Sequence, residues 1–476
     1  MPGKVSRRRF LKRSTLAGAG FLLVPRAVLG GRGYLSPSEK LNIAVVGVGG
    51  RGAALVNAVS EHNLVAFCDV DDKRAARTYE RFPKVPRYRD FRVMLERHPE
   101  IEAVMVATPD HTHAVIAMTA MRHGKHVYVE KPLTHNLKET RLLTETARAK
   151  GLITQMGNQG ASGEGVRQIM EWIDAGLIGT VHRVHCWTNR PIWPQGVPTP
   201  TGEYQVPETL DWDRWLGPAA WRPYNPAYLP FKWRGWWDFG TGALGDMGCH
   251  IMDPPVKALR LGYPEAVEAS AGQVYIGDFL EADYVDSCPP SSKIHFFFPQ
   301  RGELPPVELV WYDGGILPRR PDELLPNEPM GETGGGCIFE GTEGKIMCGV
   351  YGRNPTLLPT RLMKEVQLPE PSLPRVETSH QLDWVNAIKE KRQPSSHFDY
   401  AGKLTEIVLM GNLAIRSYNI RVLKPGKKPG DWAPYDYPGR IRLLWDGDNM
   451  RITNFEPANE FVFRQYRPGW EELLKA

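Results

Sequence analysis

The chain of 476 residues has little of what marks metal-binding, membrane-spanning or disulfide-rich proteins. Its six cysteines are widely spaced and form no C-x-x-C pair, so zinc ribbons and thioredoxin-like redox chemistry lack support. No segment reaches about 18 uninterrupted apolar residues, which argues against stable insertion into a membrane. We therefore treat the cysteines as structural and expect no metal site.

The chain also has only a small excess of one sign of charge over the other. The formal net charge is only +5, and much of it lies in the first 13 residues, so the sequence gives little support for nucleic-acid binding. No internal repeat is present. With 42% hydrophobic and 24% charged residues, the composition is that of an ordinary globular protein long enough for two or three domains.

The most informative stretch that is present runs from Leu41 to Gly52 (LNIAVVGVGGRG), where an apolar β-branched run breaks into glycines before a helical pattern. The glycines follow the G-x-G-x-x-G spacing, in which the first permits a tight turn, the second lets the backbone approach a pyrophosphate, and the third lets helix and strand pack closely. The N-terminus of the helix then faces the phosphates with free N–H groups. A glycine turn without a ligand is the alternative. The predicted dinucleotide-binding residues here are Gly47, Gly49, Gly50, Arg51 and Gly52.

A second apolar run, residues 63–69, ends in Asp69, 22 residues after the first glycine of the turn. A carboxylate at this place can accept a hydrogen bond from a ribose 2′-hydroxyl and would repel a 2′-phosphate. The sequence therefore favours NAD over NADP, although Arg51, Lys73 and Arg74 could soften that preference.

Strands and helical patterns alternate from Leu41 to about Met156, which predicts a doubly wound parallel sheet of the Rossmann type. Beyond Gly157, longer polar and aromatic strands with many prolines predict an α+β domain with a large, open, mainly antiparallel sheet. The expected fold class is α/β. The predicted strands of the first part lie near 41–46, 64–69, 102–106, 126–129 and 152–156, and its helices near 51–60, 72–81, 112–122 and 137–150. The predicted division is a signal and linker over 1–33, an NAD-binding domain over 38–157, a substrate and oligomerisation domain over 158–423 and a C-terminal extension over 424–476.

Eight of the fourteen tryptophans lie between Trp187 and Trp237, interleaved with polar residues. Aromatic faces beside hydrogen-bonding groups suit the two faces of a sugar ring, but we expect most of the eight to be core or subunit-contact residues. Trp233, Arg234 and Asp238 are candidates for sugar binding. A structural ion pair is the alternative for the two charged residues.

Three further motifs follow the glycine turn: Thr108-Pro-Asp-His-Thr-His113, Glu130-Lys-Pro132 and Gly242-Ala-Leu-Gly-Asp-Met-Gly-Cys-His250. With these four motifs in this order, the chain resembles the glucose-fructose oxidoreductase / inositol dehydrogenase / rhizopine catabolism (Gfo/Idh/MocA) family over roughly residues 41 to 420. The resemblance implies an NAD-dependent oxidoreductase that forms a homo-oligomer.

The resemblance also implies three catalytic residues. In that family the lysine of E-K-P, here Lys131, lies near the nicotinamide and the reacting carbon, where its ammonium can orient a hydroxyl, stabilise an alkoxide and pass a proton. Asp246 and His250 are four residues apart and so share one face of a helix. The resemblance assigns proton abstraction to His250, whose type of side chain ordinarily has a pKa near neutrality, and orientation of substrate or a share in the proton transfer to Asp246. The alternatives are a surface lysine, a helix-capping aspartate, a hydrogen-bonded core histidine and a metal-binding Asp-His pair that lacks a third ligand.

A further set of cofactor contacts is implied by the same resemblance. Four residues would lie along the nicotinamide side of the cleft, Glu130 would reach ribose hydroxyls, and an amide after the last sheet strand would meet the nicotinamide carboxamide or a sugar hydroxyl. The first four are Thr108, Pro109, Asp110 and His111, and the amides are Asn158, Gln155 and Gln159.

The N-terminus carries the sequence SRRRFLK over residues 6–12, an apolar stretch over 14–25 and small residues around 27–31. This arrangement resembles a twin-arginine export signal. It implies the twin-arginine translocase as a partner, a periplasmic or otherwise extracytoplasmic location, and a dinucleotide that is loaded before export and tightly held. A basic leader on a cytoplasmic enzyme is the alternative.

Together these features predict hydride transfer between the nicotinamide and a secondary hydroxyl of a sugar, glycoside or cyclitol. One alternative is an NAD-dependent glycosidase, in which oxidation to a transient 3-keto sugar allows elimination, addition of water and return of the hydride. Another is a catalytically silent sugar-binding protein, against which the presence of Lys131, Asp246 and His250 argues.

Overall fold

The computed structural model describes residue 36 and residues 39–475, so the predicted twin-arginine segment lies outside the described residues. Within that part of the chain, the first sheet has six strands, all parallel, in the order β3-β2-β1-β4-β5-β6. This confirms the doubly wound parallel sheet. The strands are β1 (Asn42–Val46), β2 (Asn63–Cys68), β3 (Arg87–Tyr88), β4 (Ala103–Val106), β5 (His126–Val129) and β6 (Thr154–Met156).

Five helices connect these strands: α3 (Arg51–Ala58), α4 (Asp72–Arg81), α5 (Phe91–Arg97), α6 (His113–Arg122) and α7 (Leu137–Ala149). Nine of the ten residues of α6 are buried, as its nearly continuous apolar sequence requires. The alternation of strands and helices does not reveal β3, which is a two-residue edge strand, or α5. Helix α5 begins after Asp90, whose carboxylate accepts a hydrogen bond from the Arg92 N–H (2.9 Å).

The second sheet has nine strands in the described part of the chain, in the order β15-β14-β13-β7-β12-β11-β8-β18-β19. Only the β7–β12 pair is parallel, which confirms the large, mainly antiparallel sheet. The strands are β7 (Val181–Thr188), β8 (Ala266–Ala271), β11 (Ser292–Phe298), β12 (Val307–Tyr312), β13 (Gly335–Gly341), β14 (Lys345–Gly349), β15 (Thr356–Leu358), β18 (Leu443–Asp446) and β19 (Arg451–Ile452).

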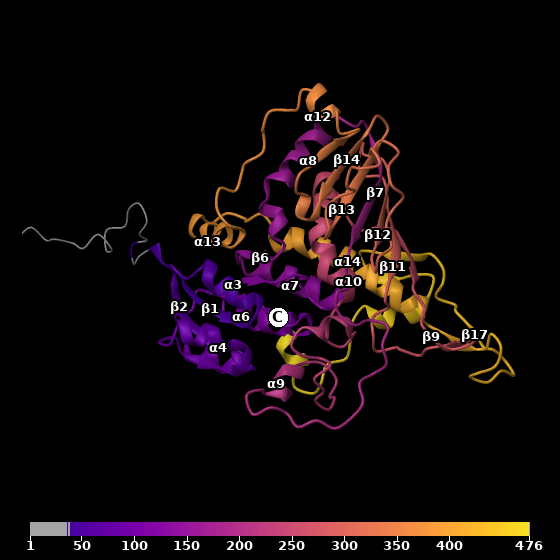
Figure 1. Ribbon diagram of the computed structural model, residues 1–476. Helices are drawn as coiled ribbons and strands as arrows, with labels where there is room; N and C mark the ends of the chain where they lie inside the picture. The colour runs from indigo at the N-terminus through magenta and orange to yellow at the C-terminus, as the bar shows by residue number, and fades with distance from the viewer. Residues whose placement is uncertain (1–35, 37–38, 476) are drawn as a thin grey trace, which may run out of the picture.

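Helix α14 (Phe398–Tyr418) packs between the two sheets, with sixteen buried residues. It contacts α7 and β6 on one side and β8 and β11 on the other, so a single hydrophobic core joins Val104 of the first sheet to Phe296 of the second. Figure 1 shows the two sheets side by side, with α14 and α10 (Gly242–Ile251) at their junction. The site described below lies where these two parts meet.

Smaller elements complete the described chain. Two short hairpins, β9 (Tyr275–Gly277) with β10 (Leu280–Glu281) and β16 (Val422–Leu423) with β17 (Tyr435–Asp436), lie outside the main sheets. In Figure 1 the β9 and β17 hairpins project from the body at the lower right. The remaining helices are η2 (Asp110–Thr112), η3 (Gln159–Ser162), α8 (Glu164–Asp174), α9 (Trp212–Leu216), η4 (Lys232–Gly235), α11 (Asp253–Ala258), η5 (Val350–Gly352), α12 (Leu362–Glu365), α13 (His380–Glu390), η6 (Glu456–Phe461) and η7 (Glu471–Leu474).

The residues after 424 do more than cover the surface. Strand β18 pairs with β8 and so extends the second sheet, and η7 then packs against α6 of the first domain. In Figure 1 this yellow segment returns to the nucleotide-binding part and ends near α6 and α9. The predicted domain boundaries remain a prediction, but the C-terminal segment contacts both halves of the molecule.

The cysteines are all buried and free, and burial raises the pKa of the Cys68 and Cys249 thiols. No helix in the described part of the chain is both long and apolar enough to cross a membrane.

His380 at the start of α13 ties this helix to the first domain. Its Nε2 lies 2.8 Å from the Met156 carbonyl oxygen and its Nδ1 lies 2.6 Å from Ser162 Oγ. A neutral imidazole satisfies both contacts, with Nε2–H donating to the carbonyl and Nδ1 accepting from the hydroxyl. Burial lowers the pKa of His380 from 6.5 to about 4.

The lowered pKa of His380 predicts acid sensitivity. Because the unfolded chain takes up this proton at a higher pH than the folded chain, the stabilisation is present above pH 6.5 and is lost as the pH falls towards 4. The loss amounts to about 3 kcal/mol for this histidine. His380→Gln keeps a donor and an acceptor but cannot titrate, so urea unfolding at pH 7 and pH 4.5 should show a smaller acid-induced loss in the variant than in the wild type. An equal loss in both proteins would contradict the assignment.

Candidate functional site

A cavity of about 450 Å³ lies at the carboxyl ends of the parallel strands, between the first sheet and the second domain. This edge is where ligands bind in open α/β sheets. Its walls come from the loops after β1, β2, β4 and β5, and from η4, α10 and η5 across the cleft. The cavity therefore runs from the glycine turn to the residues expected to carry the chemistry.

The glycine turn fits a dinucleotide phosphate. Gly47 has a φ of 78°, and a Cβ there would lie 2.7 Å from the Ala107 carbonyl oxygen. A Cβ on Gly52 would lie 1.7 Å from the Gly47 carbonyl oxygen, so only glycine lets α3 start this close to β1. Gly50 precedes the helix, and no side chain caps the helix N-terminus, which leaves its N–H groups to face the cavity.

Asp69 supports this turn directly. Its Oδ2 accepts hydrogen bonds from the N–H groups of Val48 (2.8 Å) and Gly49 (3.2 Å). Burial raises the pKa of this carboxyl, and the bound N–H groups oppose that rise. Arg74 lies over the turn, with its Nη2 2.7 Å from the position that a Cβ on Gly50 would take. The structure thus brings Asp69 and Arg74 together at one end of the cavity.

At the other end of the cavity, Lys131 and Asp246 form an ion pair. Lys131 Nζ donates to Asp246 Oδ1 (2.9 Å) and to the Asp246 carbonyl oxygen (2.5 Å). Arg234 Nε also donates to Oδ1 (3.2 Å), and Arg190 Nε lies 3.4 Å from Oδ2. Burial opposes ionisation of Asp246, but Lys131 and Arg234 outweigh it and hold the pKa of Asp246 well below its ordinary value. Asp246 is therefore a permanent carboxylate that orients cations.

His250 lies one helical turn from Asp246 on α10 and is 4% exposed. Burial, aided by the charge of Lys131, lowers its pKa well below the ordinary value, so the imidazole is neutral across the physiological range. Its Nδ1 has no hydrogen-bond partner among the described residues. The ring packs edge to face with Tyr351, at 4.6 Å between centroids. The expectation based on the ordinary pKa of imidazole therefore does not hold here, because burial keeps the base neutral.

The other predicted cofactor contacts divide into those that line the cavity and those that do not. Thr108, Pro109, Asp110 and Glu130 line it, and Arg51 Nε donates to Glu130 Oε1 (2.8 Å). His111 does not, because its ring is fully buried with its nitrogens at the carbonyl oxygens of Phe239 (3.2 Å) and Trp215 (2.9 Å). Asn158 and Gln155 are also absent from the cavity wall: Ser396 Oγ donates to Asn158 Oδ1 (2.5 Å), and Gln155 donates to the His380 carbonyl oxygen (2.5 Å). Gln159 lines the cavity.

The candidates for sugar binding divide in the same way. Trp233 and Arg234 line the cavity, with the guanidinium 4.2 Å from the Trp233 ring centroid. Asp238 lies outside the cavity wall and accepts from Arg222 Nε (2.5 Å), so its ion-pair partner is Arg222 and not Arg234. Four tryptophans, Trp212, Trp215, Trp233 and Trp236, belong to one buried cluster, in line with the expectation that most are core residues.

The sequence patterns missed several cavity-lining residues, among them Arg190, Phe231 and Tyr351. Arg190 follows β7, and Tyr351, with a φ of 66°, lies in η5 about a hundred residues after His250 in the chain. No spacing rule links them to the four motifs. A non-glycine residue held at positive φ beside a buried histidine is a known signature of functional sites, but it is visible only in the structure.

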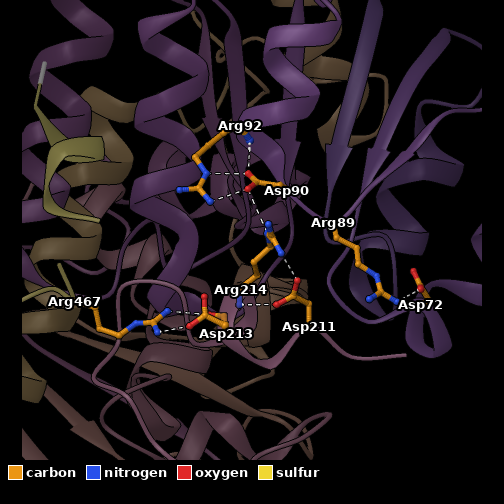
Figure 2. A network of polar contacts seen from close by, with 8 residues as sticks. All are labelled: Asp72, Arg89, Asp90, Arg92, Asp211, Asp213, Arg214 and Arg467. Carbon is orange, nitrogen blue, oxygen red and sulfur yellow. Dashed lines mark hydrogen bonds and ion pairs between the residues drawn. The ribbon is translucent and has the colours of Figure 1, made fainter. Parts of the chain in front are cut away.

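The Asp69 end of the cavity is covered by α9 and by the C-terminal segment. Figure 2 shows the ion pairs that hold this cover: Arg214 of α9 reaches Asp90 (3.3 Å) of the first domain, and Arg467 reaches Asp213 (2.6 Å). Backbone hydrogen bonds join the same parts, from Asp211 N to the Val70 carbonyl oxygen (2.8 Å) and from Asp72 N to that of Thr209 (2.9 Å). Trp470 of the C-terminal segment lines the cavity itself.

This cover predicts slow exchange of a bound dinucleotide. Arg214→Ala removes the contacts with Asp90 and Asp211, so we expect the dinucleotide to leave about 3- to 10-fold faster, because a partly exposed ion pair contributes up to about 1 kcal/mol. Stopped-flow displacement of NADH fluorescence by excess NAD measures the rate. Arg260→Ala, which breaks an exposed ion pair with Asp174 elsewhere, is the control. Equal rates in both variants would show that the cover does not limit exchange.

The fold and site together define a protein in which an NAD-binding Rossmann domain and an α/β domain meet at one cavity. In the described residues, no group of three or more His, Cys, Asp or Glu could hold a metal ion. Residues 41–158 match the NAD-binding Rossmann fold of the Gfo/Idh/MocA oxidoreductase family, and residues 163–272 match the C-terminal α/β domain of that family. These two segments of the chain are therefore similar to the two domains of the Gfo/Idh/MocA family.

Relatives share sequence with parts of the chain, and solved structures share its fold. The chain is 30% identical over 152 residues to inositol 2-dehydrogenase of Burkholderia multivorans, a match that covers 31% of this chain and 45% of that protein. It is 31% identical over 205 residues to a glycosyl hydrolase family 109 protein of Saccharopolyspora erythraea, covering 37% and 44%. Each match thus spans less than half of the relative's length. The WlbA dehydrogenase of Bordetella pertussis, solved with NADH and UDP-GlcNAcA, has the same fold, with a TM-score of 0.53, 16% identity and coverage of 81% of this chain and 99% of that one.

Proposed function

We propose that the protein is an NAD-dependent oxidoreductase that acts on a secondary hydroxyl of a sugar, glycoside or cyclitol. The observation that carries the proposal is the convergence of Lys131, Asp246 and His250 at one end of the cavity that begins at the glycine turn. The name of the inositol dehydrogenase relative supports the substrate class.

The residues of the chain divide the work in this proposal. Bound NAD supplies the acceptor for the hydride that leaves the carbon bearing the hydroxyl. Gly47, Gly49 and Gly52 give the phosphates close access to the backbone, and the N–H groups at the start of α3 offset their charge. Asp110 and Glu130 line the wall between the turn and Lys131.

Proton handling falls to Lys131 and His250. The Lys131 ammonium, held by Asp246 at 2.9 Å, orients the substrate hydroxyl and stabilises the oxygen as it loses its proton. His250 is neutral and lines the cavity, so we assign the acceptance of that proton to its imidazole. The hydroxyl proton would pass to His250, and the substrate carbon, having given its hydride to the cofactor, would become a ketone.

A second candidate is a glycosidase that oxidises its substrate, eliminates the glycosidic substituent, adds water and returns the hydride. The cover over the Asp69 end favours it, because a retained dinucleotide suits a reaction without net oxidation. The glycosyl hydrolase relative supports it by name. Paired carboxylates in the usual glycosidase geometry are not required for this route.

One experiment separates these candidates. The near-ultraviolet absorbance of reduced nicotinamide is followed on the purified protein loaded with NAD, before and after mixing with sugars, glycosides and cyclitols. A rise with a particular substrate supports the dehydrogenase. Cleaved glycoside without a lasting rise in absorbance supports the glycosidase. If no compound gives a rise in absorbance or a cleaved product, the protein is a silent sugar-binding protein.

For location, we propose export by the twin-arginine translocase, on the strength of the SRRRFLK sequence at residues 6–12. Cell fractionation of a strain that produces the full chain tests this, with the twin arginines Arg7 and Arg8 both changed to lysine as the matched variant. Export of the wild type alone supports the proposal, and retention of both in the cytoplasm overturns it.

A further inference from the structure

The catalytic end of the cavity holds more positive than negative charge. Three cations surround the single carboxylate of Asp246, at 2.9 Å for Lys131, 3.2 Å for Arg234 and 3.4 Å for Arg190. The side chains of the three cations are only 13–23% exposed. Solvent therefore screens this charge poorly, and a site of this kind favours a ligand that neutralises it.

The neighbouring groups do not neutralise this excess positive charge. His250 is neutral. The other cavity-lining carboxylate near these cations is Asp110, whose Oδ2 accepts from Thr241 Oγ1 (2.6 Å). Glu130 is paired with Arg51 at 2.8 Å, so these two cancel. The carboxylates are Asp246 and the buried Asp110, and burial raises the pKa of Asp110. The three cations therefore leave an excess of positive charge at this end of the cavity.

The two arginines also have unused donors. Arg190 Nη1 donates to Asn189 Oδ1 and its buried Nε lies 3.4 Å from Asp246 Oδ2, but no hydrogen bond within the described chain uses its Nη2. Arg234 uses Nε towards Asp246 and Nη1 towards the Phe231 carbonyl oxygen (3.4 Å), and no hydrogen bond within the described chain uses its Nη2. The Arg234 guanidinium stacks on Trp233 and Phe231, 4.2 and 4.4 Å from their ring centroids, and this stacking fixes the plane of the guanidinium. Planar guanidinium donors match the geometry of a carboxylate.

We propose that the substrate is a sugar acid, whose carboxylate binds Arg190 and Arg234 while its secondary hydroxyl faces Lys131 and His250. This inference rests on the proposed action on a sugar hydroxyl, and it narrows the substrate class. It makes Arg190 a determinant of specificity.

The test compares matched pairs of acidic and neutral sugars: glucuronate with glucose, and galacturonate with galactose. Calorimetric binding to the NAD-loaded protein should be at least about 10-fold tighter for one uronate than for its neutral partner, because hydrogen bonds to a charged group contribute about 1.5–3 kcal/mol. Arg190→Gln should abolish that ratio. Arg353→Gln is the control, since it removes an equal charge beside Tyr351 from an exposed residue outside the cavity wall.

Arg190→Lys keeps the positive charge but lacks the planar guanidinium. Unfolding curves of all variants show whether each variant is folded. Equal affinity for acidic and neutral sugars, no binding of either uronate, or a preference that survives in folded Arg190→Gln would each overturn the inference. Preferential binding of a uronate without reduced nicotinamide or cleavage products would keep the inference and overturn the proposed function. Turnover of neutral sugars, together with equal affinity for acidic and neutral sugars, would keep the proposed function and overturn the inference.

Discussion

Lys131→Met is expected to lower kcat by about 10²- to 10⁴-fold, the range over which a positioned proton-transfer group acts. The side chain lies between the cavity and Asp246, with Nζ 2.9 Å from the carboxylate, and it is the cation closest to Asp246. Methionine keeps the length of the side chain but removes the ammonium, so the substrate hydroxyl loses both its donor and the charge that stabilises an alkoxide. Single-turnover formation of reduced nicotinamide measures the effect.

Lys232→Met is the matched control for this prediction. Lys232 lies on η4 beside the site, but it is exposed and is not part of the cavity wall. The affinity for NAD, measured by calorimetry, should stay within a few-fold of the wild type in both variants. A folded Lys131→Met variant with kcat within three-fold of the wild type would remove Lys131 from the chemistry and favour a silent site.

Gly52→Ala is expected to destabilise the fold and to abolish dinucleotide binding. The added Cβ would lie 1.7 Å from the Gly47 carbonyl oxygen and 2.7 Å from its carbonyl carbon, both backbone atoms that cannot rotate away. Helix α3 must therefore move off β1, a form of overpacking that costs about 1–3 kcal/mol or more. Urea unfolding measures the stability, and a calorimetric titration with NADH measures the binding.

Gly49→Ala separates the two effects. Its Cβ would meet Arg74 Cγ at 2.5 Å, a flexible side-chain atom, but also the Arg74 carbonyl oxygen at 2.8 Å, so we expect a smaller loss of stability than in Gly52→Ala. Binding should still fall, because the backbone at this glycine must approach the pyrophosphate. Gly262→Ala, where an added Cβ meets nothing within 4 Å, should change neither property. If Gly52→Ala binds NADH like the wild type, the turn is not the phosphate site.

The sequence predicted most of the first domain because its signals are local. An apolar β-branched run, a glycine turn and a helical pattern lie within about twenty residues, and β1, β2, β4, β5 and β6 all fall within a few residues of their predicted ranges. Strand β3 was not predicted because two residues carry no periodicity. Helix α5 escaped because a seven-residue helix next to a two-residue strand does not stand out from the surrounding pattern.

The candidate site was predictable only where a motif carries it. Lys131, Asp246 and His250 were predicted from E-K-P and from the glycine-rich helix start, and the structure places all three on the cavity wall. The sequence could not predict that His111 and Asn158 point into packed protein. Their neighbours, Trp215 and Ser396, lie more than a hundred residues away along the chain.

The sequence by itself determined the kind of nucleotide turn, the class of fold and the lysine, aspartate and histidine of the site, because each depends on residues close together in the chain. Only the tertiary structure determined whether these side chains are ionised and which residues surround them. Burial makes His250 neutral, and Lys131 and Arg234 keep Asp246 ionised. The folded chain also brings Arg190, Tyr351 and Trp470 to the same cavity from distant segments. Ionisation depends on burial and on nearby charge, and both are set by contacts between segments that sequence spacing does not record.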